Sequence, residues 1–509
     1  MRSSAGTSRT CGGALRWHRY TSRPRRITQH IQQSHATFLL CIFFTLIHSI
    51  LVVHFCNAQS SRWVTAYYAG WQLGNGENGY LPVSKVDFSA LTHVIHFALV
   101  PRPDGSLDST SNSITRMGAL ALLKMAHAYD AKVLICIGGA GSEPAFQAAT
   151  DTAIVQTFVS NIVAFVTNVG YDGVDIDWEP IDQGDNVRFT RLASMLRESL
   201  NAASRFHVLT TTCVGGNQAI MARDQEFFDQ INIMTYDMSF PSQGWVVWFN
   251  SPIYDGGIKF PGLDEYVPSI DADVKDFESA GVVAGKIGIG AEFGGTVWKG
   301  VTLPGQLLSG LLSVQYDVPL YASDGSGIMQ RYYDAGSYSW DSAAQAGYLS
   351  ISGLLGIFGE FVSYDDSNSI KAKAHYIDSA GIGGIILYEL GMGYPGDGTF
   401  PLLNSVKSSF ASILRNRPPD IALAAKLEHN YPNPFNPSTT ITFSTYVFGQ
   451  VEVSVYNLLG EKIATLEQGP MSPGTYSTRW DGAGFPSGVY VCRMKFGNTV
   501  VSTKMLLIK

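Results

Sequence analysis

Three carboxylates at alternate positions make the stretch YDGVDIDWEP (171–180) the part of the sequence best equipped for chemistry. The three acids are Asp175, Asp177 and Glu179. Side chains two residues apart in a strand point to the same side, so all three are expected along one edge, in steps of about 6–7 Å. Pro180 has no N–H to donate to a sheet, which predicts that the strand ends at Glu179.

Carboxylates this close cannot all be ionised at once. Protons are shared along the row, and at least one pKa is raised. A carboxyl group that stays protonated at the mouth of a cleft is what a general acid requires. We therefore predict that Glu179, the outermost acid, donates a proton in an acid–base reaction.

Two other interpretations of the three acids compete with catalysis. A calcium loop of the EF-hand type fails, because Pro180 stands where that loop needs glycine and Asn186 where it needs glutamate. A solvated acidic strand face fits poorly with the apolar residues Val174, Ile176 and Trp178 between the acids. The catalytic interpretation is therefore favoured.

The elements that must position these acids form a repeating pattern. From residue 62 onward, short β-branched runs alternate with helical patterns such as 119–130 and 158–170. Eight such units in about 350 residues predict an α/β fold, a (β/α)₈ TIM barrel, with Glu179 at the catalytic mouth. A doubly wound sheet is the alternative, but IGGAG (137–141) lacks the complete nucleotide-binding fingerprint. The expected strands are 63–70, 92–100, 132–139, 173–179, 207–216, 231–237, 286–293 and 384–390.

Two further regions depart from this repeat. About 90 residues separate expected strands seven and eight, and residues 299–362 are rich in Tyr, Gly and Ser, which predicts a small inserted α+β lobe. Residues 425–509 show alternating strand patterns with turn residues between them, which predicts an all-β sandwich. The predicted domains are thus a barrel over 59–414 with its lobe, a linker over 415–424 and a C-terminal sandwich.

The beginning of the chain predicts an export signal. Residues 1–58 contain seven arginines and no acidic residue, and an apolar run over 38–53 precedes the small-residue site CNA (56–58). This order predicts a secretory signal peptide that is cleaved after Ala58. An N-terminal membrane anchor is the alternative, since 16 apolar residues are just short of a span.

Charge and cysteine content narrow the classes of function. Residues 59–509 carry 28 basic and 42 acidic side chains, a formal charge of −14, which argues against nucleic acid as a partner. Beyond the leader only Cys136, Cys213 and Cys492 remain, which fit no disulfide framework and are predicted to be small buried residues. The six histidines there form no HExxH and no Cys/His cluster, so we expect no catalytic metal and no cofactor. We also expect a monomer.

Four motifs in the predicted barrel resemble those of glycoside hydrolase family 18, the chitinase-like barrels. DGVDIDWE (172–179) is similar to the family signature DGxDxDxE, and MTYD (234–237) to its MxYD on strand six. CIGG (136–139) resembles SxGG with a cysteine in place of serine, and residues 361–391 resemble the closing stretch into strand eight.

The likeness covers roughly residues 62–410, and the inserted lobe matches the insertion of the deeper-grooved chitinase subgroup. One departure concerns the end of strand eight, where the family usually has Trp and this sequence has Tyr388.

The resemblance implies a retaining hydrolysis in which the substrate's own N-acetyl oxygen is the nucleophile. Glu179 would protonate the glycosidic oxygen and later activate water. Asp177 would orient the acetamide and stabilise the positive oxazolinium ion, and Asp175 would hold Asp177 and share its proton. The hydroxyl of Tyr236 would donate to the acetamide carbonyl.

The resemblance also implies a set of substrate-binding residues. Met234 and Asp237 would line the subsite of the reacting sugar, and Tyr388 would be its floor. Trp178 is expected to point away from the acids and to pack instead. The candidates for further sugar stacking, each equally compatible with a place in the core, are Tyr68, Trp245, Trp248 and Trp298.

The C-terminal region resembles a second family. YPNPFNPSTTI (431–441), VYNLLGEKI (455–463) and KMLLIK (504–509) are similar to the type A sorting domain of the type IX secretion system. The resemblance implies a Gram-negative bacterium, a secreted, extracellular or cell-surface location, and the type IX secretion machinery as a partner. A cell-wall or carbohydrate-binding sandwich is the alternative, but the terminal strand ending in lysine favours sorting.

Three functions follow from these resemblances. The leading one is a secreted chitinase that hydrolyses β-1,4-N-acetylglucosamine linkages in chitin or chitooligosaccharides. An endo-β-N-acetylglucosaminidase acting on N-glycans is the second, and the inserted lobe, which deepens the groove, favours linear chitin over it. A chitin-binding lectin without catalysis is the third, and the presence of Glu179 argues against it.

Overall fold

The computed structural model describes most of the chain beyond the leader. The predicted signal peptide (1–58) and residues 416–424 of the predicted linker lie outside the described residues. No helix among the residues that are described is long and apolar enough to cross a membrane. The described ranges are 62–73, 81–203, 207–241, 244–311, 313–334, 336–353, 358–415, 425–428, 430–445, 449–471, 474–496 and 499–509.

The strand that carries the three acids belongs to a closed parallel barrel. Eight parallel strands pair in the order β1-β14-β8-β7-β6-β5-β4-β2, and pairing of β1 with β2 closes the ring. This arrangement confirms the predicted TIM barrel, and a short antiparallel strand, β3 (Leu107–Asp108), extends β2. The barrel strands are β1 (Trp63–Ala69), β2 (His93–Pro101), β4 (Lys132–Gly139), β5 (Gly173–Trp178), β6 (Val208–Cys213), β7 (Gln230–Ile233), β8 (Ile287–Glu292) and β14 (Gly384–Tyr388).

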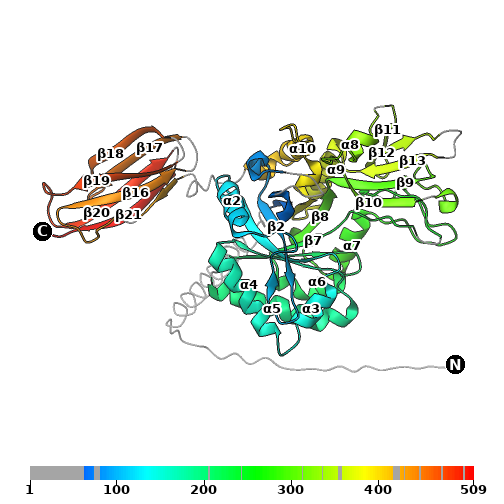
Figure 1. Ribbon diagram of the computed structural model, residues 1–509, viewed down its shortest axis with the longest axis horizontal. Coiled ribbons are helices and arrows are strands. Elements are labelled where there is room, and N and C mark those ends of the chain that lie inside the picture. The colour runs from blue at the N-terminus through cyan, green and yellow to red at the C-terminus, as the bar shows by residue number, and fades with distance from the viewer. Residues whose placement is uncertain are drawn as a thin grey trace, which may run out of the picture. The chain divides into compact units, whose positions relative to one another are not determined.

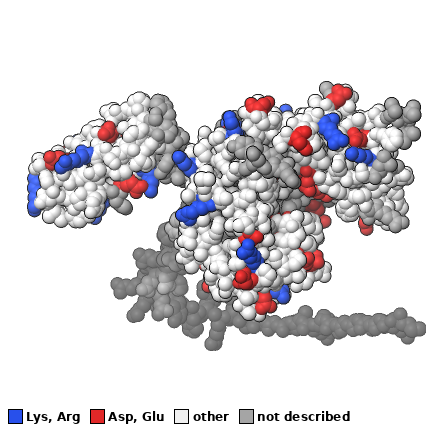
Figure 2. Space-filling view, in the orientation of Figure 1, with Lys and Arg blue, Asp and Glu red and all other residues white. Residues whose placement is uncertain are grey.

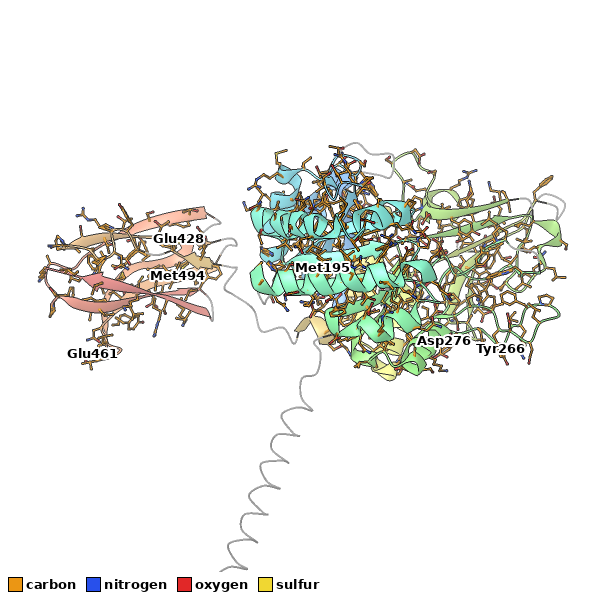
Figure 3. The ribbon with its side chains drawn as sticks, turned by 90° about the horizontal axis from the view of Figure 1, so that it is seen from below. Met195, Tyr266, Asp276, Glu428, Glu461 and Met494 are labelled. Carbon is orange, nitrogen blue, oxygen red and sulfur yellow. The ribbon has the colours of Figure 1, made fainter. Side chains whose placement is uncertain are left out.

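Helices surround the barrel, as Figure 1 shows for α2 to α7. In α4 (Val155–Val169) the buried residues Phe158, Val159, Ile162 and Val166 recur at helical spacing, so one stripe packs inward. Figure 3 labels Met195 on α5 (Asn186–Ala203), which runs along the outside of the barrel. The other helices of this part are α2 (Arg116–His127), α3 (Glu143–Ala149), α6 (Gln218–Asp224), α7 (Ile270–Ala280), α9 (Ser367–Ala380), α10 (Pro401–Ser409) and α11 (Ala411–Arg415).

Short 3₁₀ turns connect several of these elements. They are η1 (Gly70–Leu73), η2 (Val83–Lys85), η3 (Phe88–Ala90), η4 (Gln183–Asp185), η5 (Gln225–Phe227), η6 (Ala284–Lys286), η7 (Leu308–Gly310) and η9 (Leu390–Gly393). Two of them lie at the carboxyl ends of barrel strands: η1 follows β1 directly, and η9 follows β14 after one residue, Glu389.

The alternation of side chains along β5 separates the acids from the packing residues. Trp178 is 1% exposed, and its ring stacks on Phe146 of α3 at a centroid distance of 4.5 Å. It also meets Phe189 of α5 edge to face. The predicted packing role of Trp178 is thereby confirmed, and the acids two residues apart occupy the opposite, inner side of the strand.

The predicted insertion is an antiparallel sheet with the strand order β10-β9-β13-β12-β11. Its strands run from residue 294 to 364, slightly beyond the predicted limits of 299 and 362, because β9 begins two residues after β8 ends. Gly295 permits close pairing of β9 with β13, since a Cβ there would lie 2.2 Å from the Ser363 carbonyl oxygen. The elements are β9 (Gly294–Lys299), β10 (Ser313–Pro319), α8 (Ile328–Arg331), β11 (Tyr338–Asp341), β12 (Ala346–Ile351) and β13 (Glu360–Tyr364).

The C-terminal region forms two antiparallel sheets, as predicted, with the strand orders β15-β16-β19 and β18-β17-β20-β21. Alternate residues of β16 (Ser438–Thr445) are buried, including Ile441 and Phe443. Met494, labelled in Figure 3, comes from β20 and is fully buried in the shared core. The other strands are β15 (Ala425–Leu427), β17 (Gly449–Tyr456), β18 (Lys462–Met471), β19 (Gly474–Asp481), β20 (Gly488–Phe496) and β21 (Thr499–Leu507).

The three cysteines beyond the leader behave as their scattered positions predict. Cys136, Cys213 and Cys492 are free thiols and all are buried. Their burial confirms that they are small core residues.

Candidate active site

The deepest acid, Asp175, is fully buried and held by two hydroxyl groups. The Tyr67 hydroxyl donates to Asp175 Oδ2 at 2.9 Å, and the Thr210 hydroxyl donates to Oδ1 at 2.5 Å. Burial, followed by the charge of Asp177, raises the pKa of Asp175 to about 7, although both hydrogen bonds oppose the shift. The inner end of the row therefore takes up a proton readily at neutral pH.

The next two acids, Asp177 and Glu179, interact with each other. Asp177 is 4% exposed and accepts a hydrogen bond from the Thr212 hydroxyl at 2.5 Å. Burial is the largest cause that raises the pKa of both carboxyl groups, and the charge of Glu179 raises that of Asp177 further. The hydrogen bond between the two groups raises the pKa of Asp177 and lowers that of Glu179. The pair therefore shares one proton beside the cleft, and Asp177 holds it more firmly than Glu179 does.

Glu179 lies just beyond β5 and is anchored through its backbone. The Glu179 N–H donates to Ser142 Oγ at 3.2 Å, and the Glu179 carbonyl accepts from the N–H of Glu143 at 3.1 Å. The Ser142 hydroxyl also donates to the carbonyl oxygen of Asp177 at 3.2 Å. Ser142 directly precedes α3, so the start of that helix fixes the main chain on both sides of the acid.

Two glycines on β4 explain the motif CIGG. A Cβ at Gly138 would lie 2.0 Å from the carbonyl oxygen of Asp177, and one at Gly139 would lie 2.8 Å from the Phe97 ring. Both glycines have φ above +100°, which side chains rarely tolerate. Cys136, two residues earlier, places its Sγ 4.0 Å from Asp177 Oδ2, where the thiol is a weak donor. The motif therefore lets strand β4 approach the acids closely.

Aromatic rings enclose the space beside the acids. Tyr388, at the end of β14, stacks on Tyr236 at a centroid distance of 6.0 Å and meets Phe97 edge to face at 6.0 Å. The ring of Tyr67 lies 5.8 Å from that of Tyr388. Gly290 on β8 makes room for Tyr236, since a Cβ there would lie 2.7 Å from its ring. Burial raises the pKa of the Tyr236 phenol, so this hydroxyl stays protonated and able to donate.

These groups border a cleft of about 590 Å³. Asp175 lies beneath its floor, held by Tyr67, which itself lines the cleft. No group of His, Cys, Asp or Glu suited to hold a metal ion occurs among the residues that the structure describes. The predicted site residues that line this cleft are Asp177, Glu179, Met234, Tyr236, Asp237 and Tyr388.

The aromatic residues that were candidates for further sugar stacking do not line this cleft. Tyr68 is fully buried, and its hydroxyl donates to the carbonyl of Leu81 at 2.6 Å. Trp298 and Trp248 belong to the core beneath the lobe. Trp245 lies between Phe240 and Phe260, with ring centroids 4.0 Å and 4.7 Å away. These side chains complete the apolar packing of the lobe and the barrel.

Other residues of the cleft carry no motif that marks them as functional. Trp71 follows β1, and its indole nitrogen has no hydrogen-bond partner among the residues that the structure describes. Glu389 follows β14, and burial raises its pKa to about 7. Only the position of Trp71 and Glu389 just after barrel strands could have indicated their place at the mouth. The additional lining residues with polar or aromatic side chains are Tyr67, Trp71, Phe97, Asn112, Ser142, Asp317 and Glu389.

Comparisons with known proteins agree with this architecture. The family described as Glycosyl hydrolases family 18 matches residues 63–393, and the Secretion system C-terminal sorting domain matches residues 429–509. Chitinase A1 from Niallia circulans is 30% identical over 305 residues, which cover 54% of this chain and 42% of that protein. The chain thus spans less than half of the length of this relative.

Two solved structures have a similar fold. A glycoside hydrolase family 18 N-acetylglucosaminidase from Paenibacillus barengoltzii is 25% identical with a TM-score of 0.55, and the match covers 68% of this chain and 99% of that one. A group IV chitinase from Ostrinia furnacalis is 21% identical with a TM-score of 0.57, and the match covers 69% and 100% of the two chains.

Proposed function

This chain belongs to glycoside hydrolase family 18, and on that premise we propose that it is a chitinase that hydrolyses β-1,4-linked N-acetylglucosamine polymers. Its C-terminal sorting domain makes it a secreted or cell-surface protein. The machinery of the type IX secretion system is the partner implied by that domain. An insoluble extracellular polymer is a substrate suited to an exported enzyme.

The observation that carries this proposal is the pair Asp177 and Glu179 at the cleft. Their carboxyl groups interact, and burial raises the pKa of each, so a proton is available at the cleft surface. A glycosidic oxygen leaves as an alcohol only when it receives such a proton. In our proposal Glu179 delivers that proton and then removes one from the attacking water.

The nucleophile in this proposal is the acetamide oxygen of the reacting sugar. Its attack on the anomeric carbon forms a bicyclic oxazolinium ion and breaks the glycosidic bond, and water then opens the ion. In our proposal the carboxylate of Asp177 stabilises the positive charge of this ion once Glu179 has given up its proton. Tyr236 supplies a protonated hydroxyl to the acetamide, and Asp175 keeps Tyr67 and Thr210 oriented beneath.

The inserted lobe favours linear chitin over branched N-glycans. Asp317 and Pro319, both from lobe strand β10, line the cleft together with barrel residues. The lobe therefore forms a wall that turns the barrel mouth into a groove. A groove walled in this way suits an extended chain, whereas a non-catalytic lectin would not need the proton donor Glu179.

The purified protein should cleave chitin oligomers and leave the first product in the β-configuration, because two successive inversions retain the starting anomer. NMR spectra of fresh hydrolysate measure the anomer before it equilibrates. A predominance of α-product at the earliest times would contradict the mechanism. Release of N-glycans from a glycoprotein without cleavage of chitin oligomers would assign the alternative substrate class.

Tyr388 provides a test of the floor beneath the reacting sugar. Tyr388→Trp should change kcat/KM by no more than about threefold, whereas Tyr388→Ala should lower it at least about tenfold, since an aromatic platform stabilises by roughly 1 kcal/mol or more. Tyr388→Phe serves as the control that keeps the ring and its stacking on Tyr236. An alanine variant with wild-type kcat/KM would show that Tyr388 does not contact the sugar.

A further inference from the structure

A second acidic group lies on the lobe side of the cleft. Asp237 follows Tyr236, and Asp317 comes from lobe strand β10; both line the cleft that Glu179 borders. The two carboxyl groups are close enough to share a proton, and each has a raised pKa, that of Asp237 at about 7, chiefly because of burial. Among the described residues, no hydrogen-bond donor reaches Asp237 Oδ1 other than a proton shared in this way. In Figure 2, acidic side chains are visible where the lobe meets the barrel.

A third acid, Glu292, lies behind this pair and is fully buried. Its Oε2 accepts a hydrogen bond from Asn250 at 2.6 Å, whereas its Oε1 has no partner among the described residues. A Cβ at Gly294 would lie 2.6 Å from this Oε1 and 2.9 Å from the carbonyl oxygen of Val318, the residue after Asp317. The free oxygen therefore lies close to the strand that carries Asp317. Burial, followed by the charges of Asp237 and Asp317, raises the pKa of Glu292.

The described residues that line the cleft include no cation to balance these acids. Within the described residues, the lining of the cleft includes Asp177, Glu179, Asp237, Asp317 and Glu389 but no lysine, arginine or histidine. The buried Lys373 is already engaged, since its Nζ donates to Asp365 Oδ2 at 2.5 Å and to the Gly290 carbonyl at 3.0 Å. None of these described residues thus supplies a positive charge to this side of the cleft, and a cationic ligand can supply it.

We propose that the sugar position beside the reacting N-acetylglucosamine selects a protonated glucosamine, so that the preferred substrate is partially deacetylated chitin. Asp317 borders this position, and Asp237, which also lines the subsite of the reacting sugar, is the second carboxylate that its ammonium group reaches. The inference rests on the proposed function. An ammonium group offers three donors and a positive charge to these carboxylates, whereas an acetamide offers one N–H and no charge. Binding of the ammonium relieves the repulsion among the three acids, which favours the charged sugar over the acetylated one.

The test is digestion of chitosan with a known, random content of acetyl groups. The sugars on both sides of each cleaved bond are identified by sequencing the product oligomers with mass spectrometry and by NMR. We expect N-acetylglucosamine in the reacting position of nearly every product and an enrichment of glucosamine by about tenfold at one neighbouring position, the effect of one charge-assisted hydrogen bond. The enrichment should fall at high salt.

Asp317→Asn should abolish most of that enrichment, because it removes the charge and keeps the shape. Glu360→Gln is the matched control, since Glu360 lies on lobe strand β13 and does not line the cleft. The enrichment is a ratio within one digest, so a smaller folded fraction of either variant does not change it. Asp237→Asn is the second variant expected to lower it.

The outcomes separate this inference from the proposed function. A neighbouring position with the statistical sugar composition, or an enrichment that survives in Asp317→Asn and Asp237→Asn, would overturn the acidic subsite and leave the chitinase proposal intact. Glucosamine in the reacting position would instead contradict the substrate-assisted mechanism. Loss of enrichment in the Glu360→Gln control would show that the net charge of the lobe, not Asp317, selects the sugar.

Discussion

Glu179→Gln is expected to abolish hydrolysis of chitooligosaccharides while binding survives. Glutamine keeps the size and shape of the side chain but has no acidic proton to deliver to the leaving oxygen. A general acid contributes about 10²- to 10⁴-fold to the rate, so kcat should fall by at least about 100-fold. Turnover of a chromogenic chitobioside and calorimetric titration with a chitin oligomer measure the two properties separately.

Glu143→Gln is a matched control for this variant. Glu143 opens α3, its N–H donates to the Glu179 carbonyl, and its side chain accepts a hydrogen bond from Gln147 at 3.0 Å. It does not line the cleft, so its kcat should stay near that of the wild type. If Glu179→Gln retains more than about a tenth of the wild-type rate, Glu179 is not the proton donor, given the usual size of that contribution.

Asp177→Asn is expected to produce the second large effect, a fall in kcat of about 100-fold or more with a much smaller change in KM. The carboxylate matters most when positive charge develops on the oxazolinium ion, which is a transition-state effect. Steady-state kinetics on one oligomer give both constants. A rise in KM with unchanged kcat would mean that Asp177 contributes only to ground-state binding.

A mimic of the oxazolinium ion tests the same role by binding alone. A thiazoline analogue should bind the wild-type enzyme far more tightly than the parent disaccharide does, as transition-state-like species do. In Asp177→Asn this preference should largely disappear, because the neutral asparagine cannot stabilise the positive charge of the ring as a carboxylate does. Equal preference in both proteins would exclude Asp177 from stabilising the ion.

Thermal unfolding distinguishes loss of chemistry from loss of fold in this variant. Burial raises the pKa of Asp175 from 3.8 to about 7, and that of Asp177 rises as well. A raised folded-state pKa contributes stability that is present at low pH and is lost as the pH rises through the folded value. For Asp175 that loss falls between about pH 4 and pH 7. Asp177→Asn removes one carboxyl group with a raised pKa from this row, so we expect the unfolding temperature to fall less between pH 4 and pH 8 in the variant than in the wild type.

The barrel and the acid row could be predicted because both depend on short-range periodicity. Strand β5 places Asp175 and Asp177 on its inner side and Trp178 on its outer side, since consecutive side chains in a strand alternate. The eight apolar runs became the eight barrel strands, because strands covered on both faces are apolar throughout and such runs are visible within a single segment. The two glycines of CIGG likewise follow from the close approach of neighbouring strands.

The aromatic residues of the site could not be assigned in this way. Trp298 and Tyr68 are aromatic like Trp71, yet these two are buried in cores, and of the three only Trp71 borders the cleft. An aromatic ring packs as well in a core as against a sugar, so its residue type leaves the choice open. Position after a barrel strand is the one local signal, and it separates Trp71 from Trp298.

By itself, then, the sequence determined the class of fold, the direction of the three acids and the strand end at which Glu179 lies, because each depends on spacing within one segment. The tertiary structure alone decided that Asp317, 138 positions after Glu179 in the chain, lies beside Asp237 in the same cleft. No local sequence pattern predicts that Asp317 and Asp237 lie together, because their contact depends on how the strands of the lobe sheet pair and where β10 ends against the barrel. The acidic wall of the cleft exists only through this long-range packing.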